Sequence, residues 1–134
     1  MKKWLIFLLL IPAYAYAADL QTPKNLTDAF FSSVIKGNIS NAYDQLFQGS
    51  SIPNDKPQAV TALKQQTRNN LPLYGKLLGY EFIKEEKFGN SVTRLLYILK
   101  SEKGPTIWEF HFYKPENSWF LANVVFNDQF QMLR

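Results

Sequence analysis

The only histidine of the chain, His111, is the first residue to consider for chemistry, because it stands two positions after Glu109. In a β-strand this spacing puts both side chains on one face, where a carboxylate could orient an imidazole that acts as a general base. The same spacing also fits a polar pair on the surface of a sheet, which is the interpretation we favour. A metal site is not expected, since one histidine, no cysteine and scattered acidic residues offer no ligand spacing for zinc.

Several other acidic residues could serve as a catalytic base. Asp44 follows Tyr43 directly, and Glu81 and Glu85 lie in a later segment rich in residues that favour strands. No sequence motif singles out one of these residues, or Glu109, for proton transfer. The sequence therefore assigns no catalytic residue, and no cofactor is expected.

Aromatic residues are abundant, and they could line a ligand pocket or fill an ordinary core. The chain holds 11 Phe, 7 Tyr and 3 Trp among its 134 residues. Tyrosine and tryptophan combine an apolar body with a polar group that can orient a ligand, although a core with some tyrosines reaching the surface is the simpler interpretation. Asn123 interrupts an apolar strand face, and a buried amide needs a partner or water. The pocket candidates are Tyr43, Tyr74, Tyr97, Trp108, Trp119 and Asn123.

The first 17 residues have the pattern of a secretory signal peptide. Two lysines precede an apolar run over residues 4–11, and Ala15 and Ala17 form an A-x-A cleavage site. The run is far shorter than the roughly 20 residues that a spanning helix needs, and Pro12 ends it, which argues against an uncleaved anchor. We therefore expect cleavage after Ala17, a periplasmic or secreted protein, and no stable membrane anchor after cleavage.

The remaining residues, 18–134, are expected to form a single domain that is close to neutral. The formal charge of the whole chain is +4 and includes Lys2 and Lys3, so cleavage lowers it by two. The charged clusters at 84–87 and 100–103 are mixed in sign, whereas nucleic-acid binding favours a basic patch with exposed aromatic residues. Nucleic acid is therefore not expected as a partner. Without cysteine the domain has no disulfide, so its core alone must hold it together.

Helical and strand-like segments follow each other along this domain. Thr22 and Pro23 are typical of a helix start, and Gly37 of a helix end. Apolar spacing predicts a second helix within 38–47 and a third that Asp55 and Pro57 open, with a loop over 48–57 between them. Four strand-like runs at 76–87, 91–101, 105–114 and 118–127 are separated by turn signals. The sequence thus predicts an α+β domain with three N-terminal helices on one face of a four-stranded antiparallel sheet.

Residue parity predicts which side chains share a face of this sheet. In the third strand Trp108 and Phe110 point to one side and His111 to the other, and Arg94 in the second strand is expected to pair with Glu109. In the fourth strand one face is expected to hold Trp119, Leu121, Asn123 and Val125. Both faces are largely apolar, and three short helices can cover only one of them. We therefore expect a second copy of the chain to cover the other face in a two-fold homodimer.

Two segments resemble the NTF2-like superfamily, the cone-shaped α+β fold of nuclear transport factor 2 and ketosteroid isomerase. FFSSVIKGNISNAYDQLF (30–47) is similar to its helix–glycine–helix opening, and KPENSWFLANVVFND (114–128) to its closing hairpin. The resemblance spans residues 24–130 and is nearest to small exported bacterial members without an assigned role. It implies a curved sheet that wraps around the helices and leaves a pocket at the open end of the cone.

The resemblance leaves the function open, because this superfamily includes isomerases, dehydratases, ligand carriers and interaction domains. The favoured hypothesis is non-catalytic binding of a small apolar ligand in the cone, or of an envelope protein. The alternative is an isomerase or hydrolase that uses an acid in the cone, such as Asp44 or Glu109, and that predicts a carboxyl group with a raised pKa inside a cavity. A third hypothesis, an interaction dimer without ligand, predicts a cone filled by its own side chains.

Overall fold

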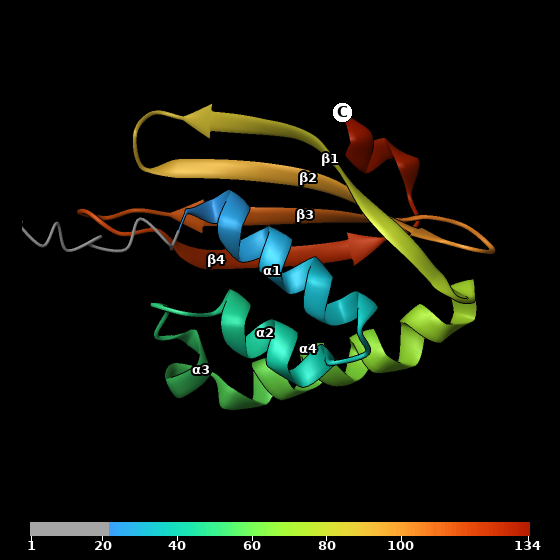
Figure 1. Ribbon diagram of the computed structural model, residues 1–134. Coiled ribbons are helices and arrows are strands. Elements are labelled where there is room, and N and C mark those ends of the chain that lie inside the picture. Colours follow the sequence, from blue (N-terminus) through green and yellow to red (C-terminus); the bar gives the residue numbers. More distant parts are fainter. Residues whose placement is uncertain (1–21) are drawn as a thin grey trace, which may run out of the picture.

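The computed structural model describes residues 22–134, in which a layer of helices lies against one face of a four-stranded antiparallel sheet (Figure 1). The predicted α+β class is therefore confirmed at the level of its helices and its single sheet. The predicted signal peptide and its cleavage site after Ala17 lie outside the described residues. Within residues 22–134, no helix has the length and apolar character that crossing a membrane requires.

The first two helices begin and end at the residues that the sequence indicates. The side chain of Thr22 accepts a hydrogen bond from the backbone N–H of Asn25 at 3.2 Å and so caps helix α1 (Pro23–Ile35). Gly37 has a φ of 84°, a conformation that glycine adopts without a steric penalty, and the chain turns there into helix α2 (Ile39–Leu46). The turn sets the two helices side by side, so that both can contact the sheet.

The segment between α2 and the sheet contains more helix than the sequence predicts. The expected loop over 48–57 holds a single-turn helix, α3 (Ile52–Asp55), because Pro53 in its first turn is already restricted to a helical φ. Helix α4 (Pro57–Asn70) follows, and a 3₁₀ turn, η2 (Leu71–Tyr74), continues it toward the first strand. The prediction of an unstructured loop was therefore wrong for residues 52–55.

The four strands form a meander in the order β1-β2-β3-β4, with short turns between neighbours. Their bounds agree with the predicted runs to within two residues at each end. They are β1 (Leu77–Phe88), β2 (Val92–Ser101), β3 (Thr106–Tyr113) and β4 (Phe120–Asn127).

The core is an aromatic layer between α1, α2 and the central strands. The ring of Phe30 on α1 lies 5.0 Å from that of Tyr43, 5.4 Å from that of Trp108 and 5.7 Å from that of Phe110, measured between ring centroids. All four side chains are fully buried. Tilted and edge-to-face ring pairs of this kind stabilise a core by about 0.5–1.5 kcal/mol each beyond the burial of their area.

Strand β4 departs from simple alternation, which corrects one predicted face. The pairing register shifts between His111 and Phe112, so that Ala122 is an extra residue in β4. Leu121 consequently lies opposite Phe112 on the buried face, whereas Asn123 lies opposite His111 on the outer face. The prediction that Leu121 and Asn123 share a face was wrong, because a β-bulge reverses the parity of every residue beyond it.

The end of the chain covers part of the outer sheet face. A short 3₁₀ turn, η3 (Phe130–Leu133), contacts β3 and lies on the side of the sheet away from α2 and α4 (Figure 1). Arg94 on β2 donates a hydrogen bond to the carbonyl oxygen of Met132 at 3.2 Å and so ties this turn to the sheet. Leu96 and Ile107 also point to this face, and both are fully buried. The chain itself thus covers part of the surface for which the sequence suggests a second copy.

Candidate functional site

Three of the six predicted pocket residues are core residues with their polar groups satisfied. Tyr43, Tyr97 and Trp108 are fully buried, and none of them lines the cavities described below. Their polar atoms meet threonine hydroxyls, at 2.7 Å for Tyr43 and 2.6 Å for Tyr97, while the indole N–H of Trp108 donates to a threonine at 2.9 Å. Burial raises the pKa of both tyrosines well above the ordinary value of 10.0.

The other three predicted residues lie apart from one another. The hydroxyl of Tyr74 donates to Asp128 at 3.2 Å near the end of β4. Trp119 lines a hollow of about 200 Å³ beside the β1–β2 turn, where the ammonium group of Lys114 lies 5.0 Å from its ring centroid. Asn123 borders a groove of about 220 Å³ between β4 and the helices α3 and α4. The structure therefore does not bring the six predicted residues together into one site.

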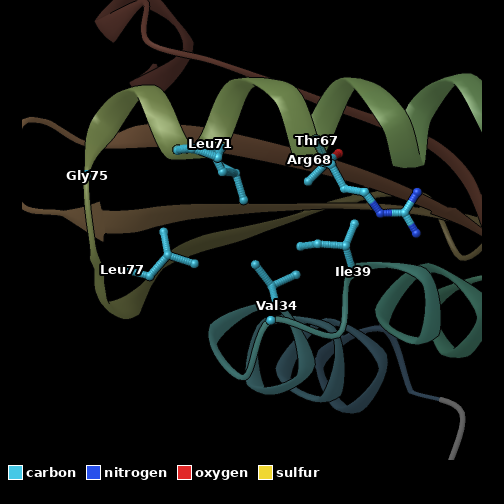
Figure 2. A pocket seen from close by; sticks show the side chains of 9 residues that line it. Val34, Ile39, Thr67, Arg68, Leu71, Gly75 and Leu77 are labelled. Carbon is cyan, nitrogen blue, oxygen red and sulfur yellow. The ribbon is translucent and has the colours of Figure 1, made fainter.

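A more apolar cavity of about 260 Å³ lies where the ends of α1, α2 and α4 meet the start of β1. Figure 2 shows the side chains of Leu71, Leu77, Val34 and Ile39 pointing toward one another across it, with Arg68 at its border. Its remaining lining residues are Gly37, Thr67, Pro72 and Gly75. We call it the helix-end cavity.

Two chain reversals border the helix-end cavity. Gly37 lies in the connection between α1 and α2, and Gly75 connects η2 to β1 with a φ of 83°. At Gly75 an added Cβ would lie only 3.3 Å from the Cβ of Glu102, so this turn has little room for a side chain. Both turns have a positive φ, which glycine adopts without a steric penalty, so glycine is the residue that suits these two borders of the cavity.

Among the described residues, Arg68 is the one charged side chain that lines the helix-end cavity. It is exposed in the last turn of α4, and within residues 22–134 it has no ion-pair partner. The hydroxyl of Thr67, the other polar side chain of the lining, already bonds to the carbonyl oxygen of Leu63 at 2.8 Å and to Tyr43 at 2.7 Å. The cavity thus combines an aliphatic wall with one free cationic group.

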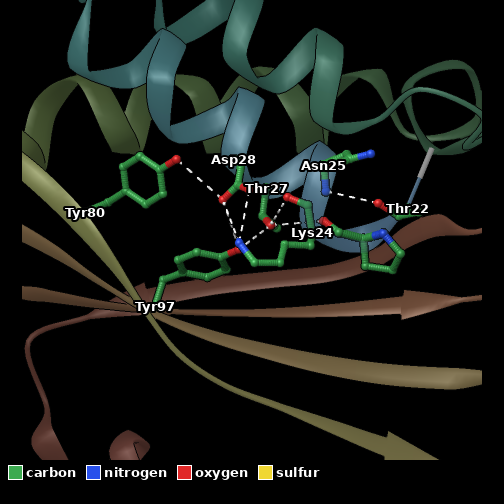
Figure 3. A network of polar contacts seen from close by, with 8 residues as sticks. Thr22, Lys24, Asn25, Thr27, Asp28, Tyr80 and Tyr97 are labelled. Atoms are coloured by element: carbon green, nitrogen blue, oxygen red, sulfur yellow. Dashed lines mark hydrogen bonds and ion pairs between the residues drawn. The ribbon is translucent and has the colours of Figure 1, made fainter. Parts of the chain in front are cut away.

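Apart from this cavity, a polar cluster joins α1 to the sheet. The carboxylate of Asp28 accepts hydrogen bonds from the hydroxyls of Tyr80 and Tyr97, each at 3.4 Å, and pairs with Lys24 at 3.1 Å (Figure 3). The pKa of Tyr80 is raised, first by burial and then by the charge of Asp28. A carboxylate beside two phenols is a combination that proton-transfer sites use. Here the lysine neutralises the carboxylate, and Asp28 lines none of the three cavities described above.

The acids of the enzymatic alternative also lie outside the helix-end cavity. Asp44 is exposed and pairs with Lys64 at 2.6 Å. Glu109 lies on the outer sheet face, where it accepts a hydrogen bond from Arg94 at 2.6 Å and lies 3.5 Å from the Nε2 atom of His111. The predicted pair of Arg94 and Glu109 and the predicted outer position of His111 are thus confirmed. Among residues 22–134 no three histidine or acidic side chains are grouped so that they could hold a metal ion.

Comparison of the chain with protein-family models, curated proteins and solved structures gives no match. The resemblance to the NTF2-like superfamily therefore stays a prediction from the two sequence segments.

Sequence reasoning missed the residues that form the helix-end cavity. Val34, Leu71 and Leu77 read as ordinary core positions, and Arg68 reads as a solvated residue on a helix. The signal in the sequence was the position of Gly37 and Gly75, each just beyond a helical segment. Two such turns at one end of a helical layer mark a place where several helix ends converge.

Proposed function

We propose that the chain is an exported, NTF2-like binding domain that takes a small apolar ligand in the helix-end cavity and does not catalyse a reaction. The observation that carries this proposal is the cavity of about 260 Å³ between the helix ends and β1. Its lining is aliphatic apart from Arg68 and Thr67, and it includes no carboxylate that could act as a base. Such a lining suits the burial of the apolar part of a ligand.

The order of the elements supports the superfamily part of the proposal. The segment 30–47, which resembles the superfamily's opening, contains the end of α1, the turn at Gly37 and α2. The segment 114–128, which resembles its closing hairpin, contains the β3–β4 turn and strand β4. Helices followed by an antiparallel meander are the arrangement that the resemblance implies. The export part rests on the signal-peptide pattern of residues 1–17.

The size of the cavity sets the expected affinity. Burial of one methylene group stabilises a complex by about 0.8 kcal/mol, so a chain of six methylenes gains about 5 kcal/mol. Association itself costs at least about 4 kcal/mol in lost translational and rotational freedom. At most about 1 kcal/mol then remains, so a ligand held only by apolar contacts is expected to bind weakly, with a dissociation constant well above a millimolar.

Methyl NMR with 1-octanol as a neutral probe tests the proposal. We expect the methyl signals of Val34, Ile39 and Leu71 to shift in a saturable way, because these side chains line the helix-end cavity. Methyl signals at the groove that Val124 borders should stay unchanged. Absence of saturable shifts at the cavity would overturn the proposal and favour the interaction domain that the sequence also allows.

A pair of matched variants controls for unfolding and for non-specific binding. Ile39→Trp places a large ring in the cavity and should abolish the shifts of Val34 and Leu71. Ile35→Trp makes the same change at a residue of α1 that is 39% exposed and does not line the cavity. It should leave binding intact. Equal binding to both variants would place the probe elsewhere.

A further inference from the structure

We infer that the natural ligand of the helix-end cavity is a small aliphatic acid whose carboxylate is bound by Arg68 while its apolar chain enters the cavity. This inference rests on the proposed function, which it deepens from an apolar ligand to an amphipathic anion. It is argued from the position of Arg68, from its lack of an acidic partner and from the charges around the cavity.

Arg68, the charged part of the lining, lies apart from the aliphatic residues that form the rest of the wall. In Figure 2 the aliphatic side chains of Val34, Leu71 and Leu77 lie together, and the guanidinium group of Arg68 lies beyond Ile39 at the border of the cavity. A ligand whose apolar chain meets the aliphatic group can therefore hold its head group beside the guanidinium. Arginine suits this role, because its planar fork matches the two oxygens of a carboxylate.

Other cations on the helices are neutralised within the chain, and Arg68 is not. Lys24 pairs with Asp28 at 3.1 Å, and Lys64 pairs with Asp44 at 2.6 Å. In residues 22–134 Arg68 forms no such pair, although it lies one turn beyond Lys64 on the same helix. Its charge is thus available to a ligand.

The charges beside the lining glycines include two lysines and one acid, and they are positive on balance. Lys36 and Lys76 directly adjoin the lining glycines Gly37 and Gly75 in the sequence, and both are exposed. The acid is Glu102, which lies beside Gly75 and whose Oε1 atom accepts a hydrogen bond from the backbone N–H of Lys76 at 2.8 Å. An anionic head group is therefore favoured at this border over a neutral or cationic one.

The simpler role of Arg68 is to stabilise the C-terminal end of α4, where a cation interacts favourably with the helix dipole. That role predicts an effect on stability but none on the choice of ligand. The two roles are therefore distinguished by binding selectivity and not by stability.

Three probes with one chain length test the inference: octanoate, 1-octanol and octylammonium, titrated near neutral pH and at low salt. We expect octanoate to bind to the full-length protein about tenfold tighter than 1-octanol, which corresponds to about 1.4 kcal/mol. Octylammonium should bind most weakly. Added salt should reduce the preference for octanoate, because the guanidinium group is exposed and its interaction is screened.

Arg68→Gln should remove most of the preference for octanoate over 1-octanol, and Arg134→Gln serves as a control that removes a charge of the same sign near the outer sheet face. Equal binding of octanoate and 1-octanol to the unmodified protein would overturn this inference and leave the proposed function in place. A preference for octanoate that is undiminished in Arg68→Gln would also overturn it. If none of the three probes binds, the proposed function itself fails.

Discussion

At the scale of single residues, the buried tyrosines show how the core satisfies its polar groups without water. The hydroxyl of Thr67 donates its one proton to the carbonyl oxygen of Leu63 at 2.8 Å, so the hydroxyl of Tyr43 must be the donor in the pair of the two hydroxyls. The hydroxyl of Tyr97 shares a hydrogen bond of 2.6 Å with the hydroxyl of Thr27 and lies 3.4 Å from the carboxylate of Asp28. Both phenols are engaged inside the protein and are not free to orient a ligand.

These two tyrosines make the fold sensitive to alkaline pH. Burial raises the pKa of Tyr43 and Tyr97 in the folded state above the ordinary value of 10.0, which holds for the unfolded chain. Their contribution to stability is therefore fully present below about pH 10 and is lost as the pH rises beyond that value. We expect the free energy of unfolding in urea to fall as the pH rises from about 10 to about 12.

Tyr43→Phe and Tyr97→Phe should each make that fall shallower, while each costs roughly 1 kcal/mol at neutral pH through the lost hydrogen bond. Tyr113→Phe is the control, because Tyr113 is 40% exposed. If all four proteins lose stability equally steeply with pH, burial of the two phenols is not the cause.

At the scale of elements, local signals were enough to predict most boundaries. These signals are the cap at Thr22, the glycine at 37 and the turns between the strands. Each acts through contacts only a few residues apart in the sequence, so it can be recognised in a single sequence. The bulge at Ala122 depends on how β4 pairs with β3, and no residue type in β4 marks it. The face of Leu121 could therefore not be predicted from alternation alone.

The candidate site was harder to predict than the elements. The large aromatic residues suggested a pocket, but Trp108 and Tyr97 are fully buried, hydrogen-bond to threonines and fill the core. The cavity instead lies where α1 and α4 end and where α2 and β1 begin. Its lining comes from residues that are far apart in the sequence, such as Val34 and Leu77. Its volume depends on the relative placement of these ends, which local patterns do not determine.

The link between Arg94 and the C-terminal turn is a property of elements that can be tested. Arg94 has a side chain that is 12% exposed, and it donates to the carbonyl oxygen of Met132 as well as to Glu109. Arg94→Met should lower the free energy of unfolding by roughly 1–3 kcal/mol, since it leaves a half-buried carboxylate without its partner. Hydrogen exchange of residues 128–134 should become faster, because the turn loses its attachment to β2.

Lys84→Met provides the comparison for this experiment. It removes only the exposed ion pair with Glu86, at 3.1 Å, so neither stability nor exchange at the C-terminus should change measurably. If exchange of residues 128–134 in Arg94→Met equals that of the unmodified protein, the turn is held by its apolar contacts with β3 instead.

At the scale of the whole molecule, both edges of the sheet carry features that oppose pairing with another sheet. Strand β1 has register shifts at two places, between Leu77 and Gly79 and between Phe82 and Lys84, and β4 has one at Ala122. Bulges twist an edge and interrupt its row of free backbone groups, which disfavours edge-to-edge association. Association of two copies is therefore expected to use a face of the sheet.

The two-fold dimer that the sequence predicts can then form only over the part of the outer face that η3 leaves open. Tyr113 and Val125 are exposed there by 40% and 43%, and the ring of Phe120 lies 5.6 Å from that of Tyr113. We expect native mass spectrometry to show a dimer, and Val125→Lys to convert it into a monomer, because the substitution replaces an exposed apolar contact by a solvated ammonium group in each copy. Leu78→Lys, at a 60% exposed residue of the opposite edge strand, should leave the dimer intact.

His111→Ala should preserve the fold and weaken association at most. A monomer at all concentrations of the unmodified protein would mean that η3 and polar side chains such as His111 suffice to shield this face.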